Sequence, residues 1–461
     1  MSSRTRFEAI RFGEFPPFEP QTVVFPTNES EGLAEVHLLV GENGTGKTRL
    51  LCALASCCGN DAPLASRIGA VDTQRAEAEV GVLVSTLSDN NSNESVVWER
   101  PDRWLQGAWD HASFASRAGE GNSERVTNVP ADRPNGFFGS RGREKPKDKP
   151  RTINAFSYNG AGTIRDAKVL PLATPGVTDK AAKQASDPAR LLNFSSQTSI
   201  SEESSFVLQT IANVKMHSAL EALSNGSRFN SLIAERIETV LTDLTGKKFY
   251  FELRTVPEFS IRVNWGGVSM TFDQLPDGMR SIIAWLGTTV ARLRMIYPEH
   301  HDSLSESFIL LVDEPETHLH PAWQRKLIPA AQRLFPNAQI FVATHSPFVI
   351  SSVNHGWIHV FRENAIGHVE IEKARPCSSG DTWIDSVEDV LGIREWYDPE
   401  TEDMLRRFRE TREKVVSKDA PVDELQTIAD SITPRSETLR ALMGKEMMQA
   451  RRLVAARGAK G

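Results

Sequence analysis

The feature that most restricts the fold of this chain is a glycine-rich segment between a buried strand and a helix. Residues 36–40 (VHLLV) form a continuous apolar run, as expected of a strand covered on both faces. The segment 41–48 (GENGTGKT) follows, and the apolar spacing beyond Lys47 predicts a helix. This order matches the pattern G-x-x-x-x-G-K-[ST] at every fixed position, so we expect an α/β protein with a phosphate-binding loop.

The residues of this loop have separate expected tasks. Glycines let successive backbone N–H groups turn inward as a nest for an anion, and the helix that follows adds partial positive charge at its N-terminus. Lys47 is expected to reach the β- and γ-phosphates, and the Thr48 hydroxyl to bind Mg²⁺. A chance glycine turn is the alternative, but the strand before and the helix after favour a binding loop. The expected nucleotide ligands are Gly41, Asn43, Gly44, Thr45, Gly46, Lys47 and Thr48.

A second motif ends another apolar run in two acids. Residues 308–312 (FILLV) predict a buried strand, and Asp313 and Glu314 follow it directly. The carboxyl ends of parallel strands share one sheet edge, where the phosphate loop is also expected. Asp313 would then hold Mg²⁺, and Glu314 would act as general base on the attacking water. Two solvated acids in a turn are the alternative, which the phosphate loop disfavours. The expected cofactors are therefore ATP and Mg²⁺.

The spacing of strands and helices predicts a parallel sheet. Residues 339–343 (QIFVA) form another buried-strand run, and a helix predicted over 321–334 separates it from the run at 308–312, which makes a βαβ unit. A further helix is predicted over 230–245. Short strands are predicted at 249–253, 260–263 and 268–272.

Composition divides the chain into five stretches. Residues 88–151 are rich in Asn, Ser, Gly and Pro, which is typical of a flexible insertion. The predicted divisions are 1–87, the N-terminal part of the core with the phosphate loop; 88–151, the insertion; 152–274, a helical lobe with connecting strands; 275–360, the rest of the core; and 361–461, a C-terminal helical partner or assembly region.

Charge and cysteine content restrict the partners and the location. A net charge of −7 argues against a wholly nucleic-acid-binding surface, although the basic stretches 141–151 and 451–460 leave nucleic acid open as a partner. The sequence contains no run of about 18 apolar residues, so no membrane-spanning helix is expected. The charged start of the chain shows no secretory signal, so a cytoplasmic protein without a membrane partner is expected. Its four cysteines form no metal-ligand pattern and are expected to be reduced thiols.

Four motifs occur in one order, at 41–48 (GENGTGKT), 275–281 (LPDGMRS), 310–321 (LLVDEPETHLHP) and 343–350 (ATHSPFVI). Together they resemble the ABC-type ATPases that include SMC and RecF proteins. The likeness is greatest to the OLD-like branch and to the ATPases of bacterial anti-phage systems such as Septu and certain retrons. The resemblance covers roughly 7–360. It implies an ABC-type P-loop ATPase head with a mixed sheet, a helical lobe and a C-terminal helical tail.

The resemblance also implies roles for residues outside the phosphate loop. The segment 275–281 corresponds to the signature motif, in which Asp277 and Gly278 would contact ATP held by a second copy. Pro276 stands where that motif commonly has serine, which removes one hydroxyl and one N–H contact. His345 corresponds to the switch histidine that senses the γ-phosphate or orients the attacking water. A plain loop-to-helix turn and a structural histidine are the respective alternatives.

The loop histidines and a missing glutamine also bear on the expected interface and metal contacts. By the resemblance, the loop that contains His318 and His320 crosses the dimer interface; a metal site formed with His345 is the alternative interpretation. The glutamine that this family places near Mg²⁺ is not found in the corresponding segment 153–160 (INAFSYNG).

Three functional hypotheses remain from the sequence. OLD proteins carry a Toprim nuclease domain after the ATPase, and the residues beyond 360 show no such acidic cluster. The first hypothesis is therefore an ATP-hydrolysing sensor or scaffold of a defence complex, which forms a homodimer or larger homo-oligomer and controls a separate effector protein, expected to be a nuclease. The second is a RecF- or SMC-like DNA-repair ATPase. The third, the energy subunit of a transporter, is disfavoured by the long insertion and the helical tail.

Overall fold

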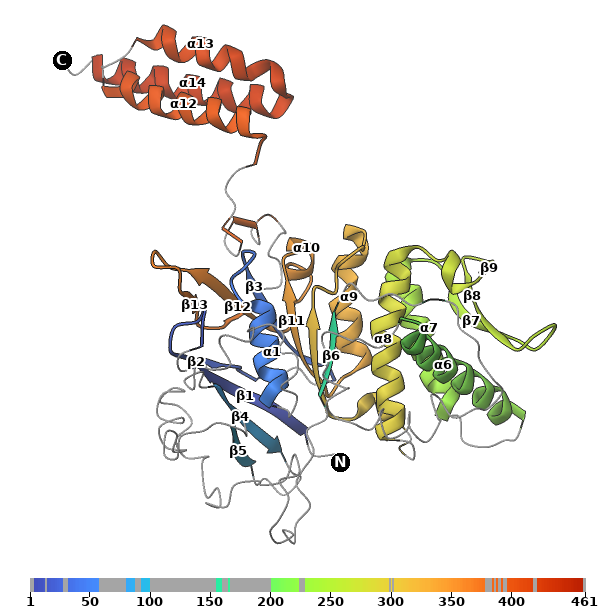
Figure 1. The fold of residues 1–461 in the computed structure, drawn as a ribbon. Coiled ribbons are helices and arrows are strands. Elements are labelled where there is room, and N and C mark those ends of the chain that lie inside the picture. Colours follow the sequence, from blue (N-terminus) through green and yellow to red (C-terminus); the bar gives the residue numbers. More distant parts are fainter. Residues whose placement is uncertain are drawn as a thin grey trace. The chain divides into compact units, whose positions relative to one another are not determined.

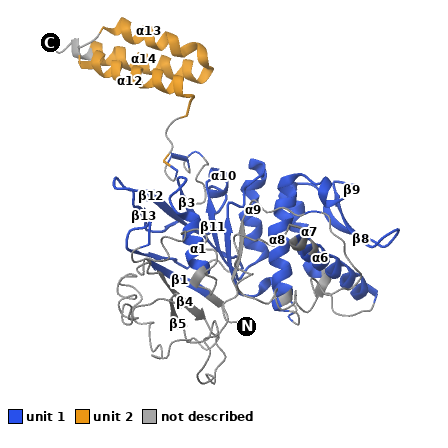
Figure 2. Cartoon of the chain, in the orientation of Figure 1, with its two compact units in different colours: residues 1–391 blue, residues 392–461 orange. Residues whose placement is uncertain are grey.

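The computed structural model comprises two compact units, residues 1–391 and 392–461 (Figure 2). The described residues are 4–12, 15–27, 32–57, 80–87, 93–99, 155–159, 165, 200–223, 229–297, 300, 302–377, 384, 387–388, 391–392, 396–417 and 421–458.

A seven-stranded sheet forms the centre of the first unit (Figure 1), in the order β13-β12-β3-β11-β10-β6, with β14 paired to β12. Strands β12, β3, β11, β10 and β6 run parallel, whereas β13 and β14 are antiparallel to β12. Every residue of β3, β10 and β11 is buried, as their apolar runs predict. The predicted α/β class with a mixed sheet is confirmed. The strands are β3 (Glu35–Gly41), β6 (Ala155–Asn159), β10 (Ile309–Asp313), β11 (Gln339–Thr344), β12 (Trp357–Glu363), β13 (Val369–Ile371) and β14 (Arg375–Pro376).

One face of this sheet packs against α1 (Lys47–Cys57) and a four-stranded antiparallel sheet in the order β2-β1-β4-β5. Phe7, Leu50 and Phe341 belong to the shared core and are fully buried. The strands are β1 (Arg4–Phe12), β2 (Gln21–Val24), β4 (Val80–Leu87) and β5 (Asn93–Glu99).

Strand β5 corrects one expectation from composition. Asn93–Glu99 falls in the stretch 88–151 that was predicted to be a flexible insertion, yet it pairs with β4 from Gly81↔Glu99 to Leu87↔Asn93. The segment SVVWE contains β-branched and aromatic residues that favour a strand, and the Asn-rich sequence before it hides this in an averaged composition. Residues 100–151 lie outside the described part of the chain.

The other face of the central sheet carries a helical lobe. Helices α6 (Ile200–Leu223), α7 (Phe229–Thr245), α8 (Asp277–Ile296) and α9 (Pro321–Leu334) enclose a second core with Val36, Leu38 and Val40. The fully buried Trp285 of α8 is its largest side chain. An antiparallel sheet of β7 (Phe249–Arg254), β8 (Ser260–Trp265) and β9 (Val268–Met270) extends the lobe (Figure 1). Short helices are η2 (Phe272–Gln274), η3 (Ser303–Ser305) and α10 (Pro347–Ile350).

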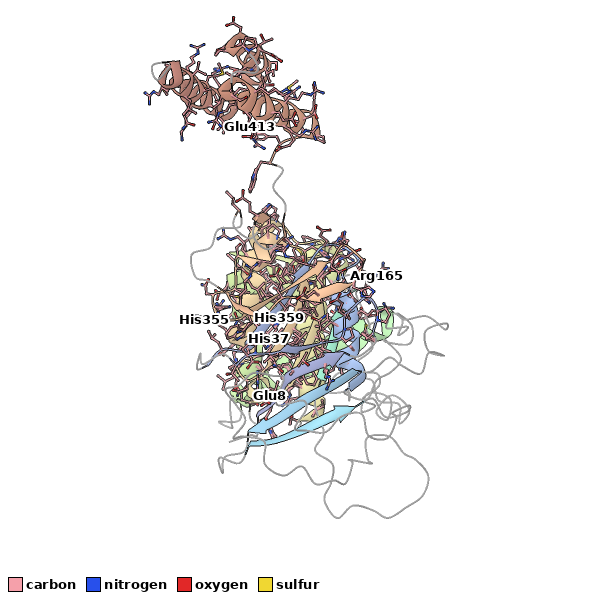
Figure 3. All side chains as sticks on the ribbon, turned by 90° about the vertical axis from the view of Figure 1, so that its left-hand side faces the viewer. Glu8, His37, Arg165, His355, His359 and Glu413 are labelled. Carbon is pink, nitrogen blue, oxygen red and sulfur yellow. The ribbon has the colours of Figure 1, made fainter. Side chains whose placement is uncertain are left out.

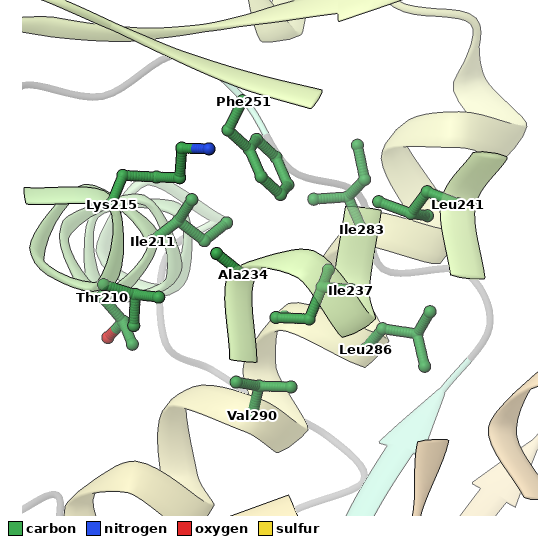
Figure 4. Close-up of a pocket in the computed structure, with 12 residues that line it drawn as sticks. Thr210, Ile211, Lys215, Ala234, Ile237, Leu241, Phe251, Ile283, Leu286 and Val290 are labelled. Atoms are coloured by element: carbon green, nitrogen blue, oxygen red, sulfur yellow. The ribbon is translucent and has the colours of Figure 1, made fainter. Parts of the chain in front are cut away.

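A small apolar cavity lies between α6, α7 and α8 (Figure 4). Ile211, Ile237 and Leu286 are among its lining residues, and its volume is about 20 Å³. This is room for about one water molecule. The Lys215 side chain at the cavity is paired with Glu238 at 2.8 Å. The cavity is therefore a gap in helix packing and is too small for a nucleotide.

A buried polar network joins the two sheets at the end of β3 away from the phosphate loop. Glu35 accepts from the Arg6 guanidinium at 2.7 Å and from His37 at 2.8 Å, and it also accepts from Gln339 at 2.7 Å. His37 in turn lies 3.1 Å from the ring nitrogen of His359, and Figure 3 shows both in the interior. Burial opposes ionisation of Glu35, but the hydrogen bond from His37 and the ion pair with Arg6 outweigh it and lower the pKa of Glu35 to about 2.

Both histidines of this network are held neutral. Burial lowers the pKa of His37 and lowers that of His359 well below its ordinary value. A neutral His37 that donates from Nε2 to Glu35 must accept at Nδ1, so His359 donates from its Nε2.

The second unit is a three-helix bundle of α12 (Pro399–Ser417), α13 (Val422–Ile432) and α14 (Glu437–Gly458), with η5 (Thr433–Arg435) before α14. Leu405, Phe408, Leu425 and Met443 are buried in its own core. Residues 361–391, which composition assigned to the C-terminal region, include the end of β12 and all of β13 and β14, and they belong to the first unit. Among the described helices, none has the length and apolar character needed to cross a bilayer.

Candidate active site

The phosphate loop begins at the end of β3, and three of its positions need glycine for different structural reasons. Gly44 and Gly46 adopt φ angles of 85° and 88°, in the left-handed region that favours glycine. A Cβ atom at Gly46 would also lie 2.8 Å from the Phe18 ring. A Cβ atom at Gly41 would lie 2.6 Å from the Phe361 carbonyl oxygen. The loop is therefore held in a curled conformation that only small residues allow.

The remaining loop residues lie at its tip and its base. Asn43 and Gly44 are exposed at the tip, whereas Thr45 is buried and its hydroxyl donates to the Glu42 carbonyl at 2.9 Å. Lys47 is buried, and its Nζ donates to the carbonyls of Gly41 at 3.0 Å and Glu42 at 2.8 Å.

Burial lowers the pKa of Lys47 to about 8, although the carboxylates of Asp313, Glu314 and Glu316 oppose this shift. An amine with this pKa is still mostly protonated at neutral pH. The loop therefore carries a buried positive charge beside the Gly41 and Glu42 carbonyls.

Thr48 and Asp313 meet although they are 265 positions apart. The Thr48 hydroxyl, in the first turn of α1, lies 3.0 Å and 2.9 Å from the two carboxylate oxygens of Asp313, at the end of β10. Neighbouring oxygens around an octahedral Mg²⁺ are about 3 Å apart, because each lies 2.0–2.1 Å from the ion. This pair of hard oxygen atoms therefore has a spacing that suits Mg²⁺.

Glu314 and His345 face each other at the ends of neighbouring strands. Their nearest side-chain atoms, Glu314 Oε1 and His345 Nε2, are 4.0 Å apart. The backbone of Glu314 has φ 50°, a left-handed conformation that costs on the order of 1–3 kcal/mol for a residue with a side chain. Its N–H donates to the Ala343 carbonyl at 2.9 Å, which holds the turn against β11. Burial lowers the pKa of His345, and the charge of Lys47 lowers it further, so the imidazole is neutral at physiological pH.

Glu316 is a residue of this site to which sequence reasoning assigned no role. Its Oε1 accepts from the Thr344 hydroxyl and from the backbone N–H of His345, the latter at 3.1 Å. Burial raises the pKa of Glu316, and Oε2 is enclosed without a hydrogen-bond partner among the described residues. Glu316 therefore fixes the end of β11 that carries His345. A third acid two positions beyond Glu314 was the available signal.

The predicted signature residues, Asp277 and Gly278, lie at the start of α8. Asp277 begins α8 and is paired with Arg280. A Cβ atom at Gly278 would lie 2.8 Å from the carbonyl oxygen of His318. The start of α8 thus packs closely against the loop that follows β10 within the same chain. This contact requires a small residue at position 278 without any second copy.

The loop histidines do not gather with His345. His318 has φ 66°, and His320 accepts from the Ala322 N–H at 3.2 Å as the N-cap of α9. In the part of the chain that the structure describes, no group of three His, Cys, Asp or Glu residues could hold a metal ion. The alternative of a histidine metal site thus has no geometric support there.

Similarity to known proteins covers parts of the chain. Residues 201–351 match the family described as "AAA domain, putative AbiEii toxin, Type IV TA system". The "Retron Vc95 probable ATPase" of Vibrio cholerae serotype O1 biovar El Tor is 29% identical over 136 residues, which are 30% of this chain and 26% of that protein. The "Septu protein PtuA" of Bacillus thuringiensis is 23% identical over 201 residues, 42% of this chain and 50% of that protein. The matches thus span a quarter to half of the relatives' length.

Among solved structures, the Smc head domain from Pyrococcus furiosus bound to the C-terminal domain of ScpA aligns with a TM-score of 0.39 at 13% identity. That alignment covers 81% of this chain and 96% of that one.

Proposed function

We propose that this chain binds ATP with Mg²⁺ and hydrolyses it, and that its nucleotide state controls a separate effector protein in an anti-phage defence complex. The contact between the Thr48 hydroxyl and the Asp313 carboxylate carries the proposal, because it joins the phosphate loop to the acidic strand end. The likeness to retron and Septu proteins supports the defence role.

We assign one or two residues to each step of the proposed hydrolysis. The backbone N–H groups of the loop and the Lys47 ammonium would hold the phosphates, while Thr48 and Asp313 would hold Mg²⁺. When bound, the ion would offset the charge of the phosphate oxygens. Glu314, exposed at the strand end, would accept a proton from the attacking water. His345, neutral and 4.0 Å away, would orient that water or the γ-phosphate.

A second copy would complete the site. Asp277 is exposed in the first turn of the 20-residue helix α8, whose N-terminus carries partial positive charge. We propose that this end, with Gly278, contacts the γ-phosphate held by the other copy. The DNA-repair alternative depends on two basic stretches. Residues 141–151 lie outside the described part of the chain, and residues 451–458 belong to α14.

Two substitutions test the ATPase proposal. Lys47→Ala should weaken ATP binding at least about tenfold, because it removes the buried ammonium. Glu314→Gln should keep ATP binding but lower turnover about a hundredfold or more, and it should accumulate dimers in mass measurements with ATP. Glu370→Gln, an exposed acid on β13, is the matched control. Wild-type turnover by Glu314→Gln would contradict the general-base assignment, and unchanged ATP affinity in Lys47→Ala would contradict the site itself.

A further inference from the structure

The C-terminal three-helix bundle has a groove between α13 and α14 with a volume of about 600 Å³. On α14 the lining residues run from Arg440 through Gly444 and Met448 to Arg452, at successive intervals of four along one helix face. This stretch continues to Ala455, so at 1.5 Å per residue the groove is about 22 Å long. Four turns of a helix would fit along it.

The walls of the groove are basic and contain no acid. Arg440, Arg451 and Arg452 are exposed and line it, whereas no Asp or Glu does. In the described part of the bundle, Arg440 and Arg452 have no ion-pair partner, and Arg451 donates to Gln426 at 2.8 Å. Glu446 on the same helix is already paired with Arg412 at 3.3 Å. The groove is thus a local excess of positive charge on a chain whose net charge is −7.

The floor of the groove is apolar and adaptable. Met443 and Met447 are buried beneath it, while 51% of Met448 is exposed. Flexible methionine side chains suit an apolar helix face that must fit among them. The groove has no aromatic side chain on which a nucleic-acid base could stack. A protein segment therefore fits this chemistry better than a nucleic acid does.

Gly444 is an independent indication that a partner's backbone comes close to the groove. A Cβ atom there would meet nothing within 4 Å, so the fold of the bundle does not require glycine. Glycine inside a helix is also the least favourable residue after proline. In the middle of the groove, its missing side chain lowers the surface at the point where a partner backbone would cross.

We propose that this groove binds an acidic amphipathic helix of a separate protein partner, with apolar residues on the methionines and carboxylates on the arginines. The inference goes beyond ATP hydrolysis, because the groove shares no residue with the phosphate loop. A failed ATPase test and a failed groove test are therefore distinguishable.

The first experiment uses the full-length chain and a displayed library of 16-residue helical peptides with one randomised face. Selection on the wild type, with counter-selection on Arg440→Glu/Arg452→Glu, should enrich peptides with an apolar stripe flanked by Asp or Glu. The best synthetic peptide should lose at least about tenfold in affinity for the double variant and should bind more weakly at high salt. No enrichment, or enrichment of peptides without acids, overturns the proposal.

Two variants separate binding from folding. Gly444→Leu should abolish peptide binding while the thermal unfolding temperature stays the same or rises, because its Cβ meets no neighbour. Lys445→Glu makes the same charge change as one of the two arginine substitutions, on exposed α14 surface outside the groove, and should alter peptide affinity less than about twofold. Equal losses in Lys445→Glu and the double variant would refute the groove.

Two alternative occupants are outcomes of the same tests. If a DNA oligonucleotide displaces the selected peptide and binds the wild type more tightly, the groove is a nucleic-acid site and the proposal is wrong. If Gly444→Leu or the double variant dissociates an oligomer in mass measurements, the occupant is a second copy, and the proposal is likewise wrong.

Discussion

Removing the Glu316 side chain tests how the end of β11 is positioned. In Glu316→Ala the Thr344 hydroxyl and the His345 N–H lose their shared acceptor. Each orphaned donor in this buried position costs about 1–3 kcal/mol, so the variant should lose about 2–6 kcal/mol of unfolding free energy. A domain in the upper part of the usual range of about 5–15 kcal/mol would still fold. Because His345 is no longer held opposite Glu314, turnover should fall about 10–100-fold with little change in KM.

Glu316→Gln is the control, since its amide oxygen can still accept both hydrogen bonds. It should restore most of the turnover and keep the pH dependence of the wild type. Turnover is measured by steady-state ATP hydrolysis across pH. Nucleotide affinity and the free energy of unfolding are measured separately, the latter in urea. Equal loss of turnover in Glu316→Gln and Glu316→Ala would mean that the carboxylate itself reacts. Wild-type turnover in Glu316→Ala would mean that His345 needs no such support. Either result refutes the positioning argument.

Three further predictions follow from the described contacts. Gly278→Ala should destabilise the chain by about 1–3 kcal/mol in urea unfolding, because its Cβ would lie 2.8 Å from the His318 carbonyl; unchanged stability would mean that the loop yields freely. Unfolding free energy should fall as the pH drops below about 6.5, by up to about 1.4 kcal/mol per pH unit for each of His37 and His359, because the unfolded chain binds protons that the buried rings do not. His359→Gln should flatten that slope. Thr48→Ala should raise the Mg²⁺ concentration for half-maximal ATP hydrolysis about tenfold, and an unshifted Mg²⁺ titration would argue against its role as a ligand.

Local sequence was sufficient to predict the parts of the site that depend on one strand and the turn after it. The apolar runs before Gly41 and Asp313 predicted buried strands, and the shared edge of parallel strands predicted that the phosphate loop with Thr48 would lie at the same edge as Asp313. The structure brings these groups within 3.0 Å. The rule works because strand direction alone decides which end of each strand reaches that edge.

Contacts between distant segments could not be predicted in the same way. The letters DEPE do not show that Glu316 turns toward His345, because that depends on the left-handed turn at Glu314. Nor does LPDGMRS show that Gly278 packs on the His318 carbonyl. Strand β5 was missed for another reason, since an Asn-rich neighbourhood outweighed its valines and tryptophan in the average.

The position of β3 in the sheet has a consequence for synthesis of the chain. Its two neighbours are β11 and β12, and the contact between His37 and His359 joins residues 322 positions apart. A growing polypeptide therefore carries the phosphate loop long before the strands that hold it have left the ribosome. Such distant pairing is slow to form, so nucleotide binding can begin only late in translation. Truncated products that end before β11 would contain every residue of the phosphate loop and would still be unable to bind a triphosphate.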